Sequence, residues 1–207
     1  DSIIEAKKII DNKELGKILN LRGVYGKSKI ITFGQPSWRT QRDIAGGGVL
    51  LDQGIHMVDL IRVFAGEFKE VYSFISNDYW KHNVEDNAYA IMRSEKRIVA
   101  MLHSTATSWR HRFELVIALE KGSLVLSGIL SGSKSYGSET LTIIYADPDN
   151  DNGDPKEIMK SFNKDNSWQE EVNEFINIIL ENKPVTSGSS SEAYKTMKLV
   201  FDIYNAD

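Results

Sequence analysis

Residues 46–59 constrain the fold more than any other stretch, and they read Gly46-Gly47-Gly48-Val49-Leu50-Leu51-Asp52-Gln53-Gly54-Ile55-His56-Met57-Val58-Asp59. The apolar pattern predicts a helix over residues 49–65 that is buried around most of its circumference and ends at Gly66. At about 100° per residue, Asp52, His56 and Asp59 fall within roughly 60° of one another. They form one polar stripe.

The polar stripe has two readings. It is either the solvent-exposed side of an amphipathic helix or the wall of a small wet cleft, because unpaired charge is costly to bury. In the second reading, Asp52 and His56 are a candidate acid–base pair. The glycines are either a flexible turn or positions where the main chain approaches a ligand or adopts unusual dihedral angles. Free amides at the helix N-terminus also favour an anion or a hydroxyl-bearing ligand near Asp52.

A metal site is the competing chemistry for Asp52, His56 and Asp59, which offer oxygen and nitrogen ligands. No second histidine stands at a matching spacing, so we expect no metal. The remaining histidines are scattered, and we expect them to be exposed or satisfied polar residues: His82, His103 and His111.

The composition excludes several classes of protein. The chain has 207 residues, of which 41% are apolar, enough for the core of a soluble globular protein. A net charge of -4 and a pI near 5.7 give no basic surface for nucleic acid or anionic lipid. The absence of cysteine excludes disulfides, zinc–thiolate sites and thiol nucleophiles, which fits a cytoplasmic location. No apolar run approaches the ~20 residues that cross a bilayer, so we expect no membrane partner.

Outside the long helix, a short helix is predicted over residues 3–12, and a loop over residues 35–48. Ser167 and Glu170 form a capping-box pattern that begins a helix with Val172, Phe175, Ile176 and Ile179 on its buried face, and residues 189–205 form the last helix. Strand patterns cover residues 19–25, 29–33, 71–75, 87–93, 97–104, 112–119, 123–126 and 141–145.

This order of elements predicts an α+β fold with a large, mostly antiparallel open sheet and helices on one face. Short turns at residues 94–96 and 120–122 indicate antiparallel hairpins. Several strands are apolar on both faces, so we expect a partner subunit to cover the second face. The chain begins at Asp1 without an initiator methionine, and we expect it to be a piece of a longer protein.

The run from Gly46 to Asp59, with Asp52 and His56 in place, resembles the signature of the Gfo/Idh/MocA oxidoreductases, the family of glucose-fructose oxidoreductase and inositol dehydrogenase. The resemblance covers almost the whole chain. It extends to Trp38, and to the segments Glu14-Leu15-Gly16-Lys17-Ile18, Glu85-Asp86-Asn87-Ala88 and Lys121-Gly122-Ser123-Leu124. It implies the C-terminal domain of that family, similar to the second domain of glyceraldehyde-3-phosphate dehydrogenase.

The resemblance implies an enzyme in which an upstream Rossmann domain binds NAD or NADP and this domain, residues 1–207, binds substrate and forms oligomers. Hydride then passes between nicotinamide and a hydroxyl-bearing carbon of a sugar, polyol or sugar nucleotide. His56 is expected to move the hydroxyl proton and Asp52 to orient the substrate or the histidine. Substrate-binding residues are expected to include Trp38, Gly46, Gly47, Gly48 and Asp59, and Tyr79, Trp80 and His82 are candidates to border the sugar.

The chain lacks both a Gly-x-Gly-x-x-Gly fingerprint and the Glu-Lys-Pro segment in which the family carries its catalytic lysine. Residues 1–207 alone are therefore expected to be inactive. We expect the intact protein to be a homodimer or homotetramer assembled through the open sheet face. The rival hypothesis is a non-catalytic module that binds carbohydrate or dimerises through its sheet.

Overall fold

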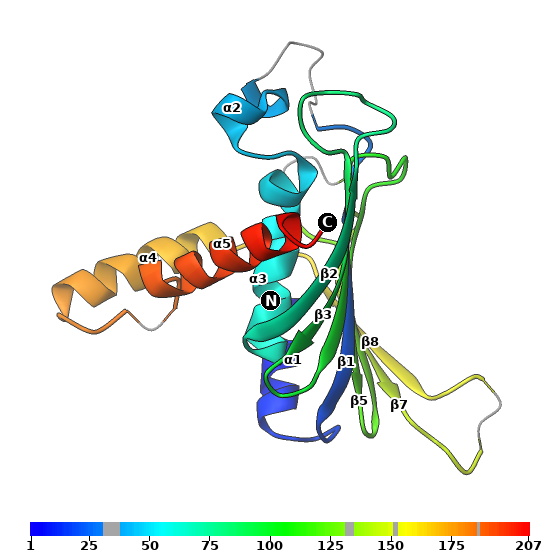
Figure 1. Cartoon of the computed structure of the whole chain (residues 1–207). Helices are drawn as coiled ribbons and strands as arrows, with labels where there is room; N and C mark the ends of the chain where they lie inside the picture. Colours follow the sequence, from blue (N-terminus) through cyan, green and yellow to red (C-terminus); the bar gives the residue numbers. More distant parts are fainter. Residues whose placement is uncertain (31–37, 131–134, 151–152, 186) are drawn as a thin grey trace.

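The computed structural model describes residues 1–30, 38–130, 135–150, 153–185 and 187–207. Helices gather on one side of a single large sheet (Figure 1). The helices are α1 (Ser2–Asp11), α2 (Arg42–Ala45), α3 (Ile55–Ala65), α4 (Ser167–Leu180) and α5 (Ser190–Tyr204), with a 3₁₀ turn η1 (Trp38–Thr40) and a π-turn η2 (Leu50–Gly54). The strands are β1 (Ile18–Gly26), β2 (Phe68–Ser76), β3 (Asn87–Ser94), β4 (Val99–Thr105), β5 (Arg112–Leu119), β6 (Gly122–Ser127), β7 (Glu139–Tyr145) and β8 (Glu157–Phe162).

The eight strands form one sheet in the order β2-β3-β4-β1-β5-β6-β7-β8. Among the strands that the structure describes, the pair β4 with β1, third and fourth in this order, is parallel, and the other pairs are antiparallel. The predicted hairpins β3–β4 and β5–β6 are confirmed. The α+β prediction, a mostly antiparallel sheet with helices on one face, is therefore confirmed.

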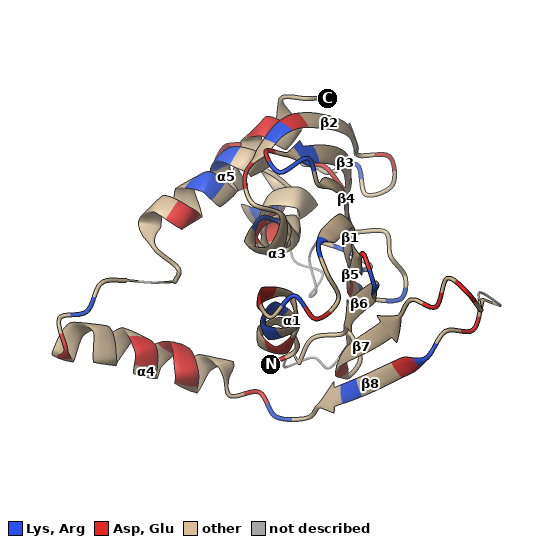
Figure 2. Ribbon diagram, turned by 90° about the horizontal axis from the view of Figure 1, so that it is seen from below, with Lys and Arg blue, Asp and Glu red and all other residues tan. Residues whose placement is uncertain are grey.

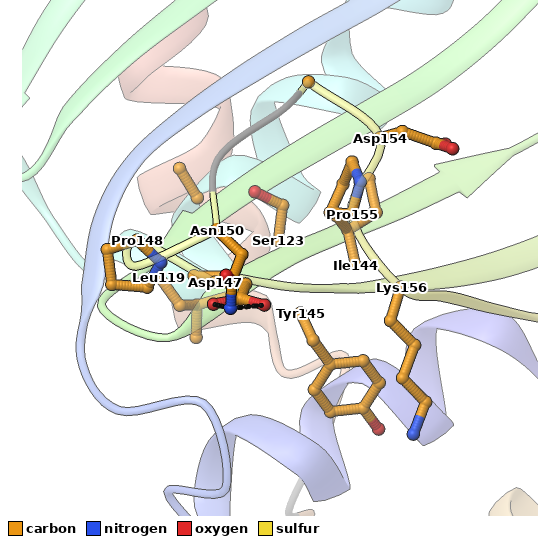
Figure 3. A pocket seen from close by; sticks show the side chains of 14 residues that line it. Leu119, Ser123, Ile144, Tyr145, Asp147, Pro148, Asn150, Asp154, Pro155 and Lys156 are labelled. Atoms are coloured by element: carbon orange, nitrogen blue, oxygen red, sulfur yellow. Dashed lines mark hydrogen bonds between the residues drawn. The ribbon is translucent and has the colours of Figure 1, made fainter.

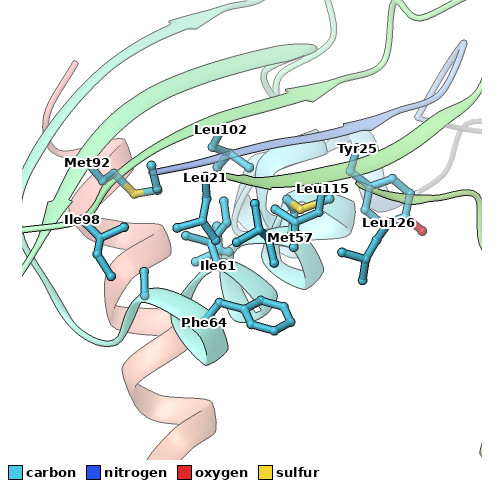
Figure 4. Close-up of a cluster of buried hydrophobic side chains, with 14 of the residues drawn as sticks. Leu21, Tyr25, Met57, Ile61, Phe64, Met92, Ile98, Leu102, Leu115 and Leu126 are labelled. Atoms are coloured by element: carbon cyan, nitrogen blue, oxygen red, sulfur yellow. The ribbon is translucent and has the colours of Figure 1, made fainter. Parts of the chain in front are cut away.

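The core lies between the helices and the sheet, and α3 is its centre (Figure 4). Strand β3 alternates in burial, so that Ala88, Ala90 and Met92 face the core. A Cβ on Gly23 of β1 would lie 2.6 Å from the sulfur of Met57. Glycine at this position lets α3 lie close against the middle of the sheet.

The stretch Arg42–Ala65 is long and apolar enough, by length and composition alone, to span a membrane. The structure breaks it at Gly46, whose φ of +82° ends α2 in the left-handed region. The rest of the stretch packs into the core, where Met57, Val58 and Ile61 have no exposed surface. Arg42–Ala65 is thus explained as the core helix of the domain and the short turn that precedes it.

Arg62 joins α3 to α5 beneath this core. Its side chain is 4% exposed, and its guanidinium donates to Glu67 at 2.7 Å, to Glu192 at 3.0 Å and to Thr196 at 2.6 Å. Asp59 lies 3.7 Å from the same guanidinium. A buried arginine is tolerated here because both terminal nitrogens of its guanidinium group donate hydrogen bonds to oxygen acceptors.

The opposite face of the sheet carries exposed apolar side chains. Tyr72, Ile91 and Met101 stand side by side on β2, β3 and β4, and Phe74 and Tyr89 form the next row. These five side chains are between 46% and 77% exposed. A row of this kind is typical of a surface that another chain covers.

Several local predictions differ from the structure. In the strand predicted over residues 29–33, residues 31–33 lie outside the described residues, and Lys29 and Ile30 are not in a strand. The loop predicted over residues 35–48 contains η1 and α2, while residues 35–37 also lie outside the described part. The edge strand β8 was not predicted, because its exposed residues show no alternation in burial.

The predictions for α4 are wrong in two respects. Ser167 is the first residue of the helix rather than its cap, and its hydroxyl donates to Asp165 at 2.6 Å. The face predicted to be buried is exposed, and no residue of α4 is buried. By contrast, Ser189 caps α5, where its hydroxyl oxygen accepts the Glu192 amide at 3.2 Å.

Candidate functional site

The carboxylate of Glu85, just before β3, holds the glycine triplet in place. Its oxygens accept the Gly48 amide at 2.9 and 2.8 Å, and Oε1 also accepts the Leu50 amide at 3.0 Å and the Tyr204 hydroxyl at 2.6 Å. The main-chain oxygen of Glu85 accepts the Val49 amide at 3.2 Å. The first amides of the helix are therefore capped by the protein's own carboxylate, where the sequence suggested a bound anion or hydroxyl group.

Each glycine of the triplet meets a different steric demand. Gly46 supplies the left-handed residue that ends α2. A Cβ on Gly47 would lie 2.3 Å from the Tyr204 hydroxyl, and a Cβ on Gly48 would lie 2.2 Å from the main-chain oxygen of Glu85. The sequence suggested that the glycines adopt unusual dihedral angles or approach a ligand closely. Gly46 has the unusual dihedral angle, whereas the close neighbours of Gly47 and Gly48 are Tyr204 and Glu85 of the protein itself.

The helix predicted over residues 49–65 opens with the π-turn Leu50–Gly54 before it becomes α3. Gly54 fits here against Ser104, whose hydroxyl donates to the Val49 carbonyl at 3.0 Å. A π-turn has more residues per turn than an α-helix, so the α-helical angle does not describe Asp52 relative to His56. Such turns occur frequently at functional sites.

Asp52 is fixed between two cations. Lys27, directly after β1, donates to Oδ2 at 2.9 Å, and the Arg39 Nε donates to Oδ1 at 3.3 Å. The side chains of Lys27 and Asp52 are 13% and 27% exposed, so this pair is partly shielded from water. The arrangement holds a carboxylate in one orientation, which suits a group that positions a substrate hydroxyl.

A hollow of about 230 Å³ lies beside Asp52. The Trp38 ring forms part of its wall, with the Arg39 guanidinium 4.6 Å from the ring centre. Of the residues that the sequence assigned to a site, the structure brings together Trp38, Gly47 and Asp52 around this hollow. The full lining is Trp38, Arg39, Ala45, Gly47, Leu51 and Asp52.

His56 lies next to the hollow's residues along the chain but does not line it. Its imidazole is exposed on the first turn of α3, with its centre 6.3 Å from that of the Tyr25 ring. It makes no hydrogen bond within the described ranges. An exposed imidazole with unoccupied nitrogens is able to exchange a proton with a bound hydroxyl group.

Two phenols lie beside His56 and Asp52. Burial raises the pKa of Tyr25, and the neighbouring Tyr136 and the charge of Asp52 raise it further. Burial also raises the pKa of Tyr136, although a hydrogen bond from the Gln53 amide, at 3.0 Å, opposes this rise. Both hydroxyl groups therefore stay protonated at neutral pH and add polar but uncharged contacts to the site.

Asp59 points elsewhere. Its carboxylate accepts a hydrogen bond from the Thr196 hydroxyl of α5 and lies near Arg62. The polar stripe of Asp52, His56 and Asp59 is thus not one surface, and Asp59 braces α3 against α5. Its role in binding substrate stays a prediction, as do the roles of Asp52 and His56.

Sequence reasoning missed Lys27, Glu85 and Tyr136 as parts of this region. Lys27 had a detectable signal, because a charged residue directly after a buried strand lies at the end of the sheet. Glu85 had a weaker one, an acidic residue before a strand. Tyr136 had none, since its loop shows no periodic pattern.

The aromatic residues proposed to border a sugar are used to anchor the β2–β3 loop. The amides of Tyr79 and Trp80 both donate to the buried carboxylate of Asp86 at 2.9 Å, and the Trp80 indole donates to the Ala106 carbonyl at 2.7 Å. His82 is stacked parallel to Trp80, with ring centres 6.3 Å apart. This loop needs no ligand to account for its aromatic side chains.

Among the described residues, no group of three or more histidine, aspartate or glutamate side chains gathers closely enough to hold a metal ion. A larger hollow of about 650 Å³ lies at the other end of the sheet, where β1 begins (Figure 3). Tyr145 and Lys156 line it, as do Asp147 and Asp154, and its described lining contains no histidine.

Residues 3–125 match the sequence profile described as GFO/IDH/MocA C-terminal domain. The chain belongs to this family. Levoglucosan dehydrogenase from Pseudarthrobacter phenanthrenivorans is 40% identical over 72 residues, which are 34% of this chain and 18% of that protein.

Solved structures share the fold of this chain over almost its whole length. Levoglucosan dehydrogenase in complex with NADH and levoglucosan gives a TM-score of 0.80 at 21% identity, covering 97% of this chain and 59% of that one. The aldose-aldose oxidoreductase of Caulobacter crescentus, complexed with glycerol, gives 0.78 at 22% identity, covering 99% and 57%. A 3-ketoreductase from Actinomadura kijaniata, in complex with NADP, gives 0.78 at 15% identity, covering 98% and 58%. This chain therefore spans less than two thirds of these structures.

Proposed function

We propose that this chain is the substrate-binding and oligomerisation domain of an NAD(P)-dependent oxidoreductase. The intact enzyme would contain a preceding dinucleotide-binding domain and would act on a hydroxyl-bearing carbon of a sugar, polyol or sugar nucleotide. Membership of the family supports this proposal. It is also supported by relatives that were solved with NADH and levoglucosan, and with NADP.

One observation carries the proposal. A carboxylate held by Lys27 and Arg39 lies beside a hollow, and an exposed imidazole follows it by four residues. Oxidation of a carbinol requires that its hydroxyl proton leave as the hydride departs. In the proposed roles Asp52 orients the substrate hydroxyl group, Trp38 contacts the apolar face of the sugar, and His56 accepts the hydroxyl proton.

The residues of this chain do not fit the dinucleotide itself. The helix that follows the glycine triplet has its first amides occupied by Glu85, so they are not open to a pyrophosphate. The chain also lacks the glycine fingerprint of a Rossmann domain. NAD or NADP would therefore be bound mainly by the preceding domain, and residues 1–207 alone should catalyse no turnover.

The open face of the sheet is the proposed oligomer interface. Tyr72, Phe74, Tyr89, Ile91 and Met101 present a continuous apolar row across three strands. A homodimer would cover this row, and a homotetramer would arise if a second interface were used.

The test uses the intact protein with a panel of sugars and polyols, each with NAD and with NADP, followed by absorbance of the reduced nicotinamide. His56→Ala should lower turnover by roughly a hundredfold or more, because it removes a positioned acid–base group. Lys69→Ala is the matched control, since the exposed Lys69 lies near the start of β2, at the opposite end of the sheet from Asp52, and should leave turnover unchanged. Equal turnover in His56→Ala and the parent would reject the role of His56.

A non-catalytic module that dimerises through its sheet, or binds carbohydrate unchanged, is the second candidate. The exposed apolar row favours this candidate, because the row could serve as a dimer interface in a protein that has no catalytic activity. The preceding sequence discriminates the two candidates. A dinucleotide fingerprint followed by Glu-Lys-Pro supports the enzyme, and an intact protein without them supports the module.

A further inference from the structure

Helix α4 projects from the body of the domain, beyond α1 and on the helix side of the sheet (Figures 1 and 2). None of its 14 residues is buried. Figure 2 shows that the helix carries acidic residues, and at about 100° per residue Glu170 and Glu174 fall on the side of α4 opposite its apolar residues. The apolar side chains form a stripe at helical spacing: Trp168, Val172, Phe175, Ile176 and Ile179.

A helix of this length needs tertiary contact. Isolated helices shorter than roughly 12–15 residues are marginal in water, and most helical stability in proteins comes from packing an apolar face. The apolar stripe of α4 is 45% to 77% exposed, so the described parts of this chain do not provide that packing. The stripe therefore has no cover among the described residues.

We propose that the apolar stripe of α4 docks onto the preceding dinucleotide-binding domain, an inference that rests on the existence of that domain in the proposed function. The solved relatives match this chain over 57% to 59% of their length, so about two fifths of each lies outside the matched region. In both views the N-terminus of this chain lies on the helix side of the sheet, near the first turn of α4 (Figures 1 and 2). A domain joined at Asp1 would emerge beside the stripe.

A second copy of the chain is the competing cover, and the position of the apolar row disfavours it. That row lies on the opposite face of the sheet from α4, so a dimer assembled through the row leaves the stripe exposed. Two uncovered apolar surfaces on opposite faces call for two different partners. The stripe is the one beside the chain's N-terminus.

Thiol labelling tests the proposal, because residues 1–207 contain no cysteine. Ile176→Cys reports on the stripe, and Glu174→Cys, on the opposite side of α4, is the matched control. Both variants are made in the intact protein and in residues 1–207, and alkylation is followed by the mass of the α4 peptide. Rates in denaturant correct for intrinsic reactivity. In the intact protein the thiol at 176 should react about tenfold more slowly than the thiol at 174, and in residues 1–207 the two should react alike.

Equal labelling at 174 and 176 in the intact protein would overturn the proposal. Concentration-dependent protection of 176 in residues 1–207 would also overturn it, since a second copy would then be the cover. Hydrogen exchange on the unsubstituted proteins repeats the comparison if a cysteine variant fails to fold, and equal exchange of the α4 amides in both would again count against docking. An intact protein that shields 176 without dehydrogenase activity keeps the docking and rejects the proposed function. An active protein that labels equally rejects the docking alone.

Discussion

Replacing Gly48 by alanine tests the claim that the glycine triplet is a packing requirement. The added Cβ would lie 2.2 Å from the main-chain oxygen of Glu85 and 2.8 Å from its nitrogen, neither of which can rotate away. Relief needs a backbone shift of roughly 1 Å, since carbon contacts are comfortable only beyond about 3.5 Å. A shift of that size stretches the bonds from the Glu85 carboxylate to the Gly48 and Leu50 amides past the hydrogen-bond limit.

The expected cost is about 3 kcal/mol, from two or three buried hydrogen bonds at roughly 1–1.5 kcal/mol each. For a domain of this length that lowers Tm by about 6–12 °C. Urea unfolding of residues 1–207, followed by circular dichroism, measures the free energy directly. If the glycines exist only for a ligand, Gly48→Ala should instead change the free energy of unfolding by less than about 0.5 kcal/mol, and that result would refute the packing argument.

Gly47→Ala is the matched comparison. Its Cβ would meet the Tyr204 hydroxyl at 2.3 Å, at the far end of a side chain that is able to move, so the loss should be smaller, about 1–2 kcal/mol. Adding Tyr204→Phe should recover part of the loss in Gly47→Ala and none of the loss in Gly48→Ala. Equal recovery in both double variants would contradict the assignment of one neighbour to each glycine.

Three further predictions address stability, pH and assembly. Arg62→Met should lower the free energy of unfolding by about 2 kcal/mol, because it removes the hydrogen bonds to Glu67, Glu192 and Thr196. The loss is limited because the carboxylates of Glu67 and Glu192 are half exposed and water can solvate them. As the control, Lys195→Met removes an exposed cation and should cost under about 0.5 kcal/mol. Burial lowers the pKa of His103 below its ordinary value of about 6.5, so the unfolded chain takes up the proton first as pH falls. The unfolding free energy should therefore rise as the pH increases toward 6.5 in the parent, but less steeply in His103→Phe, and equal slopes would contradict this. Ile91→Asp on the open sheet face should convert an oligomer to a monomer by light scattering, whereas Val63→Asp on the exposed side of α3 should not.

The sequence predicted those elements whose burial repeats along the chain. The alternation of Ala88, Ala90 and Met92 predicted β3, and the apolar positions of residues 49–65 predicted the core helix. Strand β8 and the exposure of α4 escaped prediction because each depends on surroundings rather than on a pattern. An apolar stripe predicts that a helix face will be covered, but it does not say whether the cover is in the same chain.

The structure brings some of the proposed site residues together, but not with the geometry that the sequence predicted. Asp52 and Trp38 line the same hollow. The predicted polar stripe assumed about 100° per residue, and the π-turn at Leu50–Gly54 does not have this angle. Asp59 faces α5 instead. Long-range contacts fixed the rest. Glu85 accepts the amide of Gly48, which lies 37 residues before it in the chain, and no local pattern predicts such a bond.

The parallel pairing of β1 with β4 has a consequence for how the molecule forms. On one side of that seam, β2, β3 and β4 follow one another as a meander, and on the other side β5 to β8 do the same. Each meander can assemble from neighbouring segments, but the seam joins residues 20–26 to residues 99–105 and must close a long loop first. Refolding should therefore begin with the two meanders, β2–β4 and β5–β8, and a slower step should follow in which β1 joins them. Until β1 inserts between them, the edges of β4 and β5 are open to pairing with a foreign strand.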